Sequence, residues 1–128
     1  MNYYFSRKIE GNLDQIIEKI AEGLKEEGFG ILSDINIKDL FKQKINVEFR
    51  PYRILGACNP VFSNKAITAE DRAGLMLPCN FVVQEMGDGL VDVSVVDPVA
   101  SMTAIDNTTL KDIASQIREK LIFIVDEL

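Results

Sequence analysis

The sequence has no histidine and no tryptophan, and it contains only two cysteines, Cys58 and Cys79, among its 128 residues. Without histidine, a Cys-His nucleophile pair cannot form. Two thiolates do not complete a tetrahedral zinc shell, although two copies of the chain would supply four. The spacing of the two cysteines also differs from that of a Cys-x-x-Cys redox motif. We therefore predict a protein that binds no metal and no cofactor.

Long apolar runs and an excess of positive charge are absent as well. No stretch of about 18 uncharged apolar residues occurs, and residues 1–7 lack the charged-then-apolar order of a signal peptide. We therefore expect a cytoplasmic protein without a membrane partner, in which both thiols stay reduced. Asp and Glu total 20 against 14 Lys and Arg, for a net charge of −6. This charge repels phosphate backbones, so we expect no nucleic-acid partner.

The length and composition predict a single domain that covers residues 1–128. Hydrophobic residues make up 47% of the chain, which is enough to bury a core at this size. The sequence contains no internal repeat, low-complexity run or linker. We therefore place no domain boundary.

Two long stretches have the spacing of amphipathic helices. Apolar residues recur three and four apart from Leu13 onward, with Asn12 as a cap and Gly28 as a stop signal. The same spacing follows Asp106 or Asn107, either of which can cap a final helix. Two shorter helices are predicted at 38–44, after Asn36, and from Asn59-Pro60 to Glu70.

Extended segments alternate with these helices. Gly87-Asp88-Gly89 separates two such segments and is typical of a β-hairpin turn. Because helices and strands are interleaved while the hairpin is antiparallel, we predict an α+β fold, with a mixed β-sheet and helices packed against it. The extended segments are 1–9, 29–37, 45–49, 52–57, 81–86 and 90–96.

The two cysteines mark a candidate ligand-binding or reactive-thiol site. Cys58 precedes the helix expected after Asn59, where backbone N–H groups and the helix dipole can stabilise a thiolate. Arg53 and Arg50, on the preceding run, are the nearest cations in the sequence. Alternatively, each cysteine is a small buried hydrophobe, an interpretation that applies more strongly to Cys79.

Three polar residues complete the candidate site. Asn59 and Asn80 each follow a cysteine, at the ends of predicted strands. Asp97 ends another strand, before Pro98, and can point toward the same end of the sheet as Cys58. Asp97 can equally be a turn residue that accepts backbone N–H groups. The catalytic residues, if there are any, stay unknown at this stage.

Five segments of the chain together resemble the domain-of-unknown-function family numbered 302. The resemblance runs nearly from end to end, and the strings around the two cysteines are its most specific part. It implies a small α+β fold, an often homodimeric state and no established activity. The segments are Gly28-Phe29-Gly30, Val47-Glu48-Phe49-Arg50, Tyr52-Arg53-Ile54-Leu55-Gly56-Ala57-Cys58-Asn59-Pro60, Leu77-Pro78-Cys79-Asn80 and Val96-Asp97-Pro98.

Two functional hypotheses follow from these observations. The preferred one is a non-enzymatic small-ligand-binding or interaction module, because no general base is identifiable. The alternative is a thiol-dependent enzyme or carrier that uses Cys58. We also expect a homodimer, since Ile122, Phe123 and Val125 widen the apolar stripe of the last helix beyond what one sheet face needs.

Overall fold

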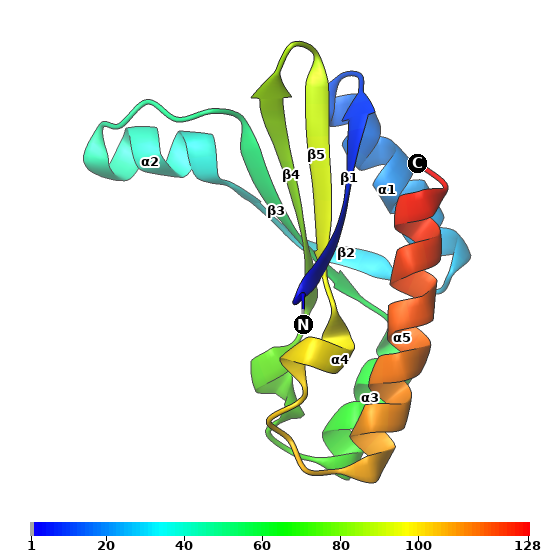
Figure 1. Ribbon diagram of the computed structural model, residues 1–128. Helices are drawn as coiled ribbons and strands as arrows, with labels where there is room; N and C mark the ends of the chain where they lie inside the picture. The colour runs from blue at the N-terminus through cyan, green and yellow to red at the C-terminus, as the bar shows by residue number, and fades with distance from the viewer. Residues whose placement is uncertain (1) are drawn as a thin grey trace.

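A computed structural model, which describes residues 2–128, shows one β-sheet with its two long helices on the same face (Figure 1). The strands lie in the order β1-β5-β4-β3-β2. Their bounds are β1 Tyr4–Glu10, β2 Gly30–Asn36, β3 Tyr52–Cys58, β4 Cys79–Gly87 and β5 Leu90–Val96. The helices are α1 Leu13–Glu26, α2 Ile37–Ile45, α3 Pro60–Ala69, α4 Pro98–Ser101 and α5 Thr108–Asp126, with a 3-10 turn η1 at Ala73–Met76.

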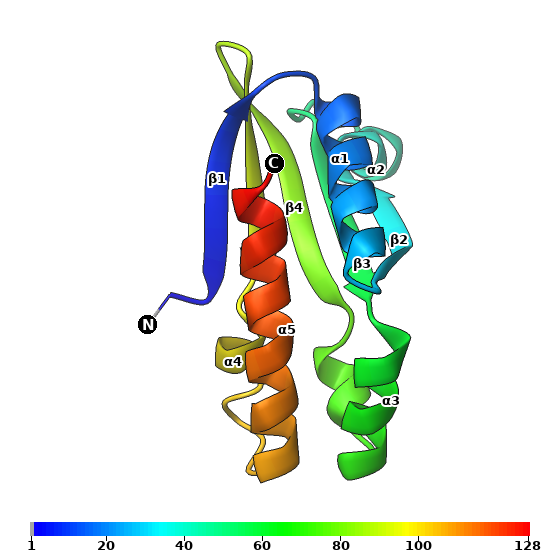
Figure 2. The same cartoon turned by 90° about the vertical axis from the view of Figure 1, so that its right-hand side faces the viewer.

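The α+β class predicted from the sequence is confirmed, but the expected mixture of strand directions is wrong. All four strand pairings, β1–β5, β5–β4, β4–β3 and β3–β2, are antiparallel. The reason lies in the connections: α3 and η1 lie beyond one end of the sheet instead of crossing its face (Figures 1 and 2). The chain therefore re-enters the sheet at the end from which it left, which makes β3 and β4 antiparallel.

Asparagine side chains start four of the helices, as the sequence predicts, and one of them, Asn59 at α3, is described with the candidate site. The Oδ1 atom of Asn12 accepts the Gln15 amide at 3.2 Å and begins α1. Asn36 begins α2 in the same way. Of the two candidates for α5, Asn107 is the cap, and its side chain accepts the Leu110 amide at 3.1 Å. Each cap satisfies an amide that the helix itself leaves unpaired.

The predicted β-hairpin is β4 and β5, joined at Asp88 and Gly89. Gly87, Asp88 and Gly89 all have positive φ angles, of 88°, 55° and 73°. The ladder pairs Phe81 with Val95 and shifts its register between Glu85 and Gly87. The turn chemistry therefore fixes which side chains of the two strands lie opposite each other.

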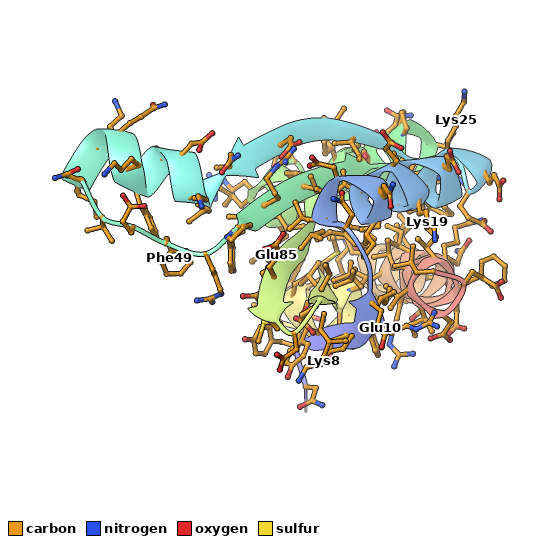
Figure 3. All side chains as sticks on the ribbon, turned by 90° about the horizontal axis from the view of Figure 1, so that it is seen from above. Lys8, Glu10, Lys19, Lys25, Phe49 and Glu85 are labelled. Carbon is orange, nitrogen blue, oxygen red and sulfur yellow. The ribbon has the colours of Figure 1, made fainter. Side chains whose placement is uncertain are left out.

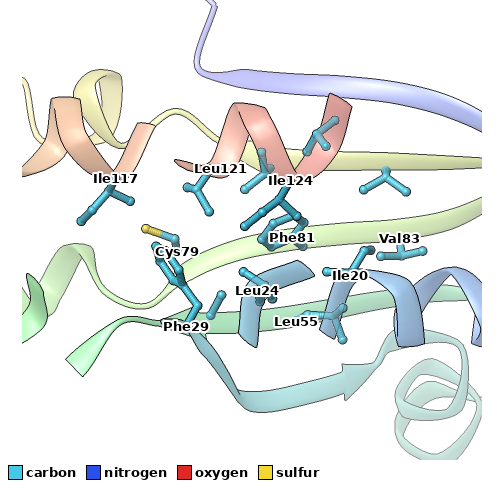
Figure 4. Close-up of a cluster of buried hydrophobic side chains, with 14 of the residues drawn as sticks. Ile20, Leu24, Phe29, Leu55, Cys79, Phe81, Val83, Ile117, Leu121 and Ile124 are labelled. Carbon is cyan, nitrogen blue, oxygen red and sulfur yellow. The ribbon is translucent and has the colours of Figure 1, made fainter. Parts of the chain in front are cut away.

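The hydrophobic core lies between one face of the sheet and the helices α1 and α5 (Figure 2). Figure 4 shows side chains of α1, β3, β4 and α5 meeting in this layer. Arg7 of β1 also donates hydrogen bonds to backbone carbonyls at the end of α5, including that of Asp126 at 2.8 Å. The residues labelled in Figure 4 are Ile20, Leu24, Phe29, Leu55, Cys79, Phe81, Val83, Ile117, Leu121 and Ile124.

The opposite face of the sheet, which we call the open face, is covered by no helix among residues 2–128. The strand register determines its composition, because the residues that alternate with the core positions point to this side. The open face carries Tyr4, Ser6 and Lys8 of β1, Ser33 and Ile35 of β2, Tyr52, Ile54 and Gly56 of β3, Asn80, Val82, Gln84 and Met86 of β4, and Asp92, Ser94 and Val96 of β5.

Residues 37–51, which we call the arm, contain α2 and its return to β3. Figures 1 and 3 show the arm projecting from the sheet, away from α1 and α5. All nine residues of α2 are exposed or half-buried. The predicted extended segment 45–49 is wrong, because its last four residues form a loop without a strand partner among residues 2–128.

Two short elements and one burial pattern differ from the sequence-based expectations. The segment 98–107, predicted as a loop, begins with α4, and η1 was not predicted at all. Val125, expected on an outer surface of the last helix, is buried in the core, whereas Phe123 is 52% exposed. Met1, the first residue of the predicted strand 1–9, lies outside the described residues.

Truncating Leu55 tests the position of the core. This side chain is fully buried in β3, at 0% exposure, while Leu32 of β2 is 69% exposed. We expect Leu55→Ala to lower the free energy of unfolding by about 2–5 kcal/mol, since it leaves a cavity. Leu32→Ala, the matched control, should change it by less than about 0.5 kcal/mol. Urea unfolding followed by circular dichroism measures both, and equal losses would contradict this core.

Candidate functional site

The two cysteines lie near one end of the sheet but in different environments. Cys79 is buried at the start of β4, beneath α5 (Figure 4). Burial raises the pKa of its thiol from 9.0 to about 11, and negative charge on Cys58 adds a smaller contribution. Cys79 is therefore protonated near neutral pH, and its thiol belongs to the core, as the alternative interpretation of this residue predicts.

Cys58 is half-buried at the end of β3 and contacts the first turn of α3. Its Sγ atom lies 2.7 Å from the Ser63 hydroxyl, which in turn donates to the Asn59 carbonyl at 2.9 Å. Either the thiol or the hydroxyl can be the donor in the contact between Cys58 and Ser63. Within residues 2–128, no side-chain hydrogen bond or ion pair links Cys58 to a base or a cation, so this geometry gives little support to Cys58 as a nucleophile.

Asn59 acts as a structural cap between two elements. It is buried, and its Oδ1 atom accepts the amides of Val61 and Phe62 at 3.1 and 3.3 Å. Its Nδ2 atom donates to the Glu27 carbonyl at 3.3 Å. The side chain thus joins the start of α3 to the end of α1, which leaves little capacity for a ligand.

Asp97 lies at the same end of the sheet as the cysteines, as its position after β5 predicts. Only 7% exposed, it accepts the Val99 amide at 3.0 Å and begins α4. Its other oxygen lies 3.3 Å from Nε of Arg118 on α5, whose guanidinium stacks 4.9 Å from the centre of the Phe5 ring. Asp97 therefore ties the end of β5 to α5. It also accepts a backbone N–H group, as the alternative interpretation of Asp97 as a turn residue predicts.

Arg53 lies far from the cysteines, at the opposite end of β3. Cys58 is five positions further along the strand, so the two Cα atoms lie about 16 Å apart. The guanidinium of Arg53 is paired with Asp34, and Nη1 lies 3.4 Å from Oδ1 of Asp14. The hydrogen bond with Asp34 raises the pKa of Arg53. Arg53 therefore fastens β2 and α1 to β3 and cannot serve as the cation for Cys58.

Asn80 faces an accessible hollow, whereas Asp97 and Arg53 line smaller ones elsewhere on the molecule. It lies on the open face, in a groove of about 790 Å³ that runs across β4 and β5. The sequence places Asn80 beside Cys79, but strand alternation sends the two side chains to opposite faces. The other groove residues were not identified from the sequence, although the alternation of Val82 and Gln84 with the core positions is a signal that could have found them.

The groove combines an apolar wall with polar groups. Tyr4 and Tyr52 lie toward its two sides, and η1 contributes Leu75 and Met76 at one end. Asp92 and Ser94 line it from β5, where the Ser94 hydroxyl donates to Oδ2 of Asp92 at 2.9 Å. Lys8 of β1 and Gln84 of β4 complete the polar set. Such a surface can contact an apolar or aromatic group and hydrogen-bond to its polar substituents.

Gly56 allows the segment before β4 to approach the sheet closely. A Cβ atom at this position would lie 2.8 Å from the Pro78 ring and would also collide with the Ser33 hydroxyl. Pro78, with Leu77, lines the groove next to Asn80. The glycine in the Gly56-Ala57-Cys58 string therefore positions one end of the groove and has no part in thiol chemistry.

Neither metal coordination nor membrane crossing is indicated within residues 2–128. Cys, Asp and Glu side chains in this range form no group of three that could hold a metal ion. In the same range, no helix is both long enough and apolar enough to cross a bilayer.

Replacing Cys79 tests the effect of its burial. In the folded protein the thiol stays protonated up to about pH 11, whereas in the unfolded chain it ionises from about pH 9. The stabilisation from the protonated form is therefore complete below pH 9 and is lost as the pH rises through 11. We expect the free energy of unfolding to fall by roughly 2–3 kcal/mol more in wild type than in Cys79→Ala over this range. Urea titrations at pH 9 and at pH 11 measure this difference for both proteins. An equal loss of unfolding free energy in wild type and Cys79→Ala would refute the assignment.

Replacing Asp97 separates its capping role from its charge. Asp97→Ala removes the cap of α4 and the partner of Arg118, so we expect a loss of about 1–3 kcal/mol in unfolding free energy. Asn is an equally good cap, so Asp97→Asn should cost less than half as much. Denaturant unfolding of both variants checks this order, and an equal loss would mean that the ion pair dominates.

Comparisons with known proteins place the chain in a family. Residues 5–128 match the family described as Domain of unknown function DUF302. A crystal structure of an uncharacterized conserved DUF302 protein from Bacillus stearothermophilus is similar, with a TM-score of 0.90, 25% sequence identity and 98% of each chain covered. Among curated proteins, no match is found. Because the family match spans almost the whole sequence, the chain belongs to the DUF302 family.

Proposed function

We propose that this protein is a non-enzymatic binding module that holds a small ligand in the groove on its open face. The observation that supports this most is the composition of the groove. Two tyrosines, Tyr4 and Tyr52, lie with polar side chains over an accessible volume of about 790 Å³. Asn80, one of the residues predicted from the sequence, supplies an amide there that can both donate and accept.

The proposal favours binding over thiol chemistry because of the environments of the two cysteines. Cys79 is buried, and the Sγ atom of Cys58 contacts only a neutral hydroxyl, that of Ser63, at the start of α3. A nucleophilic thiol needs a base or a cation close by, and Arg53 lies at the far end of β3. We therefore rank the thiol-dependent enzyme or carrier below the binding module. Reduced thiols of this kind fit the cytoplasmic location that we propose.

We further propose that the working form is a homodimer, although not by the contact first expected. Of the three α5 residues that suggested it, Val125 lies in the core and Ile122 is half-buried. The open face is a better candidate, because Tyr4 and Met86 expose large apolar surfaces there, at 39% and 48%. Exposed apolar surface of this kind marks interaction sites on proteins.

A probe titration tests the ligand site. Anilinonaphthalene sulfonate carries fused aromatic rings and an anionic group, which the tyrosines and Lys8 can accommodate. We expect it to shift the backbone amide resonances of Asn80, Val82 and Ser94 in NMR spectra of the native protein. Ser94→Trp, which fills the groove, should weaken this binding at least tenfold.

The matched control carries the same substitution on the other side of the molecule. Ser115 is exposed on α5, and Ser115→Trp should leave the affinity unchanged. Shifts confined to the amides of Ser63 and its neighbours in α3 would instead favour a site at Cys58. If no amide of the groove shifts, or if both tryptophan variants weaken binding equally, the ligand-binding proposal fails.

A further inference from the structure

The arm is a helix and loop that the rest of the chain contacts mainly through its returning loop, where Arg50 donates to Gln84 at 2.9 Å and the Phe49 ring lies 6.1 Å from that of Tyr52. An isolated helix of nine residues is not stable in water, because nucleation costs more than so few hydrogen bonds return. Helices in proteins gain their stability from packing an apolar face, yet every residue of α2 is exposed or half-buried. A surface outside its own chain would therefore stabilise the arm further.

The arm carries the apolar side chains for such a contact. Leu40, Ile45 and Val47 are all exposed, and Ile45 is 63% accessible. The arm is also an ordered unit: the Phe41 and Phe49 rings meet edge to face at 5.1 Å between their centres. These rings join α2 to the returning loop, so the exposed apolar residues are held in a defined arrangement.

The open face is the second surface without a partner. Six exposed apolar residues lie on it or at the rim of the groove, and three lie on the arm. Together they account for nine of the thirteen large apolar side chains that are exposed within residues 2–128. The six are Tyr3, Tyr4, Ile35, Leu75, Met76 and Met86.

The arm and the remainder of the chain also have opposite charge. Residues 37–51 contain four basic and two acidic residues, for a net charge of +2. The other 113 residues contain ten basic and eighteen acidic residues, for a net charge of −8. Complementary fields of this kind steer association and fix orientation. The open face itself carries one basic and one acidic residue, Lys8 and Asp92, so the negative charge that attracts the arm lies on the other surfaces of a second copy.

The length of the arm suits a neighbouring sheet. A nine-residue helix is about 14 Å long, and stacked sheets lie about 10 Å apart. Because the arm projects away from α1 and α5 (Figures 1 and 3), it extends toward the side on which a second copy would cover the open face. Helix α2 is thus longer than the distance between two stacked sheets, so the arm can reach the sheet of the second copy.

We propose that a second copy of this chain docks on the open face and that the arm of each copy packs against the partner. Each chain carries both halves of this contact, the arm and the open face, so one two-fold axis closes the pair. The inference rests on the homodimer proposed above and specifies its interface. The groove then lies between the two copies, and the ligand site is completed by the partner, which supplies the wall that one chain lacks.

A pair of aspartate variants tests the interface. Ile45 of the arm is 63% exposed and Phe123 of α5 is 52% exposed, so neither replacement empties the core. In analytical ultracentrifugation of the full chain, wild type should be a dimer. Ile45→Asp should raise the dimer Kd at least tenfold, whereas Phe123→Asp should leave it within twofold. Circular dichroism of each variant checks that the fold is kept.

A spin label on the arm locates its contact directly. Lys44→Cys in a Cys58→Ser background takes the label, and the labelled chain is mixed with unlabelled chain enriched in nitrogen-15. The label should broaden amide resonances of Tyr4, Val82 and Ser94 in the unlabelled copies. Resonances of Ser115, on the opposite side, should keep their intensity.

The outcomes separate this inference from the proposals on which it rests. A mass near 14 kDa at all concentrations overturns both the homodimer and its interface. A dimer that tolerates Ile45→Asp, or broadening on α5, keeps the homodimer and overturns the role of the arm. If the monomer instead binds vesicles of anionic phospholipid and Ile45→Asp abolishes that binding, the arm belongs to a membrane surface. Ligand binding is measured separately by the probe titration, and a monomer that still binds the probe in the groove keeps the ligand-binding proposal while overturning the completion of the site by a partner.

Discussion

The fold depends on the alternation of side chains along β4 and β5. Successive residues of a strand point to opposite faces, so Val91, Val93 and Val95 enter the core while Asp92 and Ser94 face away. A register shift of one residue would exchange the two faces and bury these polar groups, which is costly. The same pairing thus builds the core beneath α1 and α5 and the groove on the open face.

The cysteines show how the surroundings of a residue, rather than its type, determine its chemistry. Both lie near the same end of the sheet, yet Cys79 enters the apolar layer and Cys58 joins the hydrogen bonds that start α3. Asn59 and Asp97 are likewise occupied as helix caps. The polar residues that suggested a thiol site therefore hold elements together. The accessible groove instead lies on the open face of the sheet.

The parts of the fold that the sequence predicted are those with local causes. Asn12 and Asn107 begin α1 and α5 through contacts three residues away, and the hairpin turn lies within a few residues. The directions of the strands outside the hairpin, for which the predicted mixture is wrong, and the projection of the arm depend on distant contacts. Asn80 lines the groove, but the sequence grouped it with Cys79, because the strand was expected to begin at Phe81 and the alternation between the two residues was not recognised.

Hydroxyl-radical footprinting of the native protein at low and high concentration tests most directly whether the open face is the contact surface. Methionine and tyrosine side chains react readily, and Tyr4 and Met86 expose theirs on that face. Our account predicts that oxidation of both residues falls as the protein is concentrated, while oxidation of Phe123 on α5 stays constant. Oxidation of Tyr4 and Met86 that does not change with concentration, or protection of Phe123 alone, would contradict it.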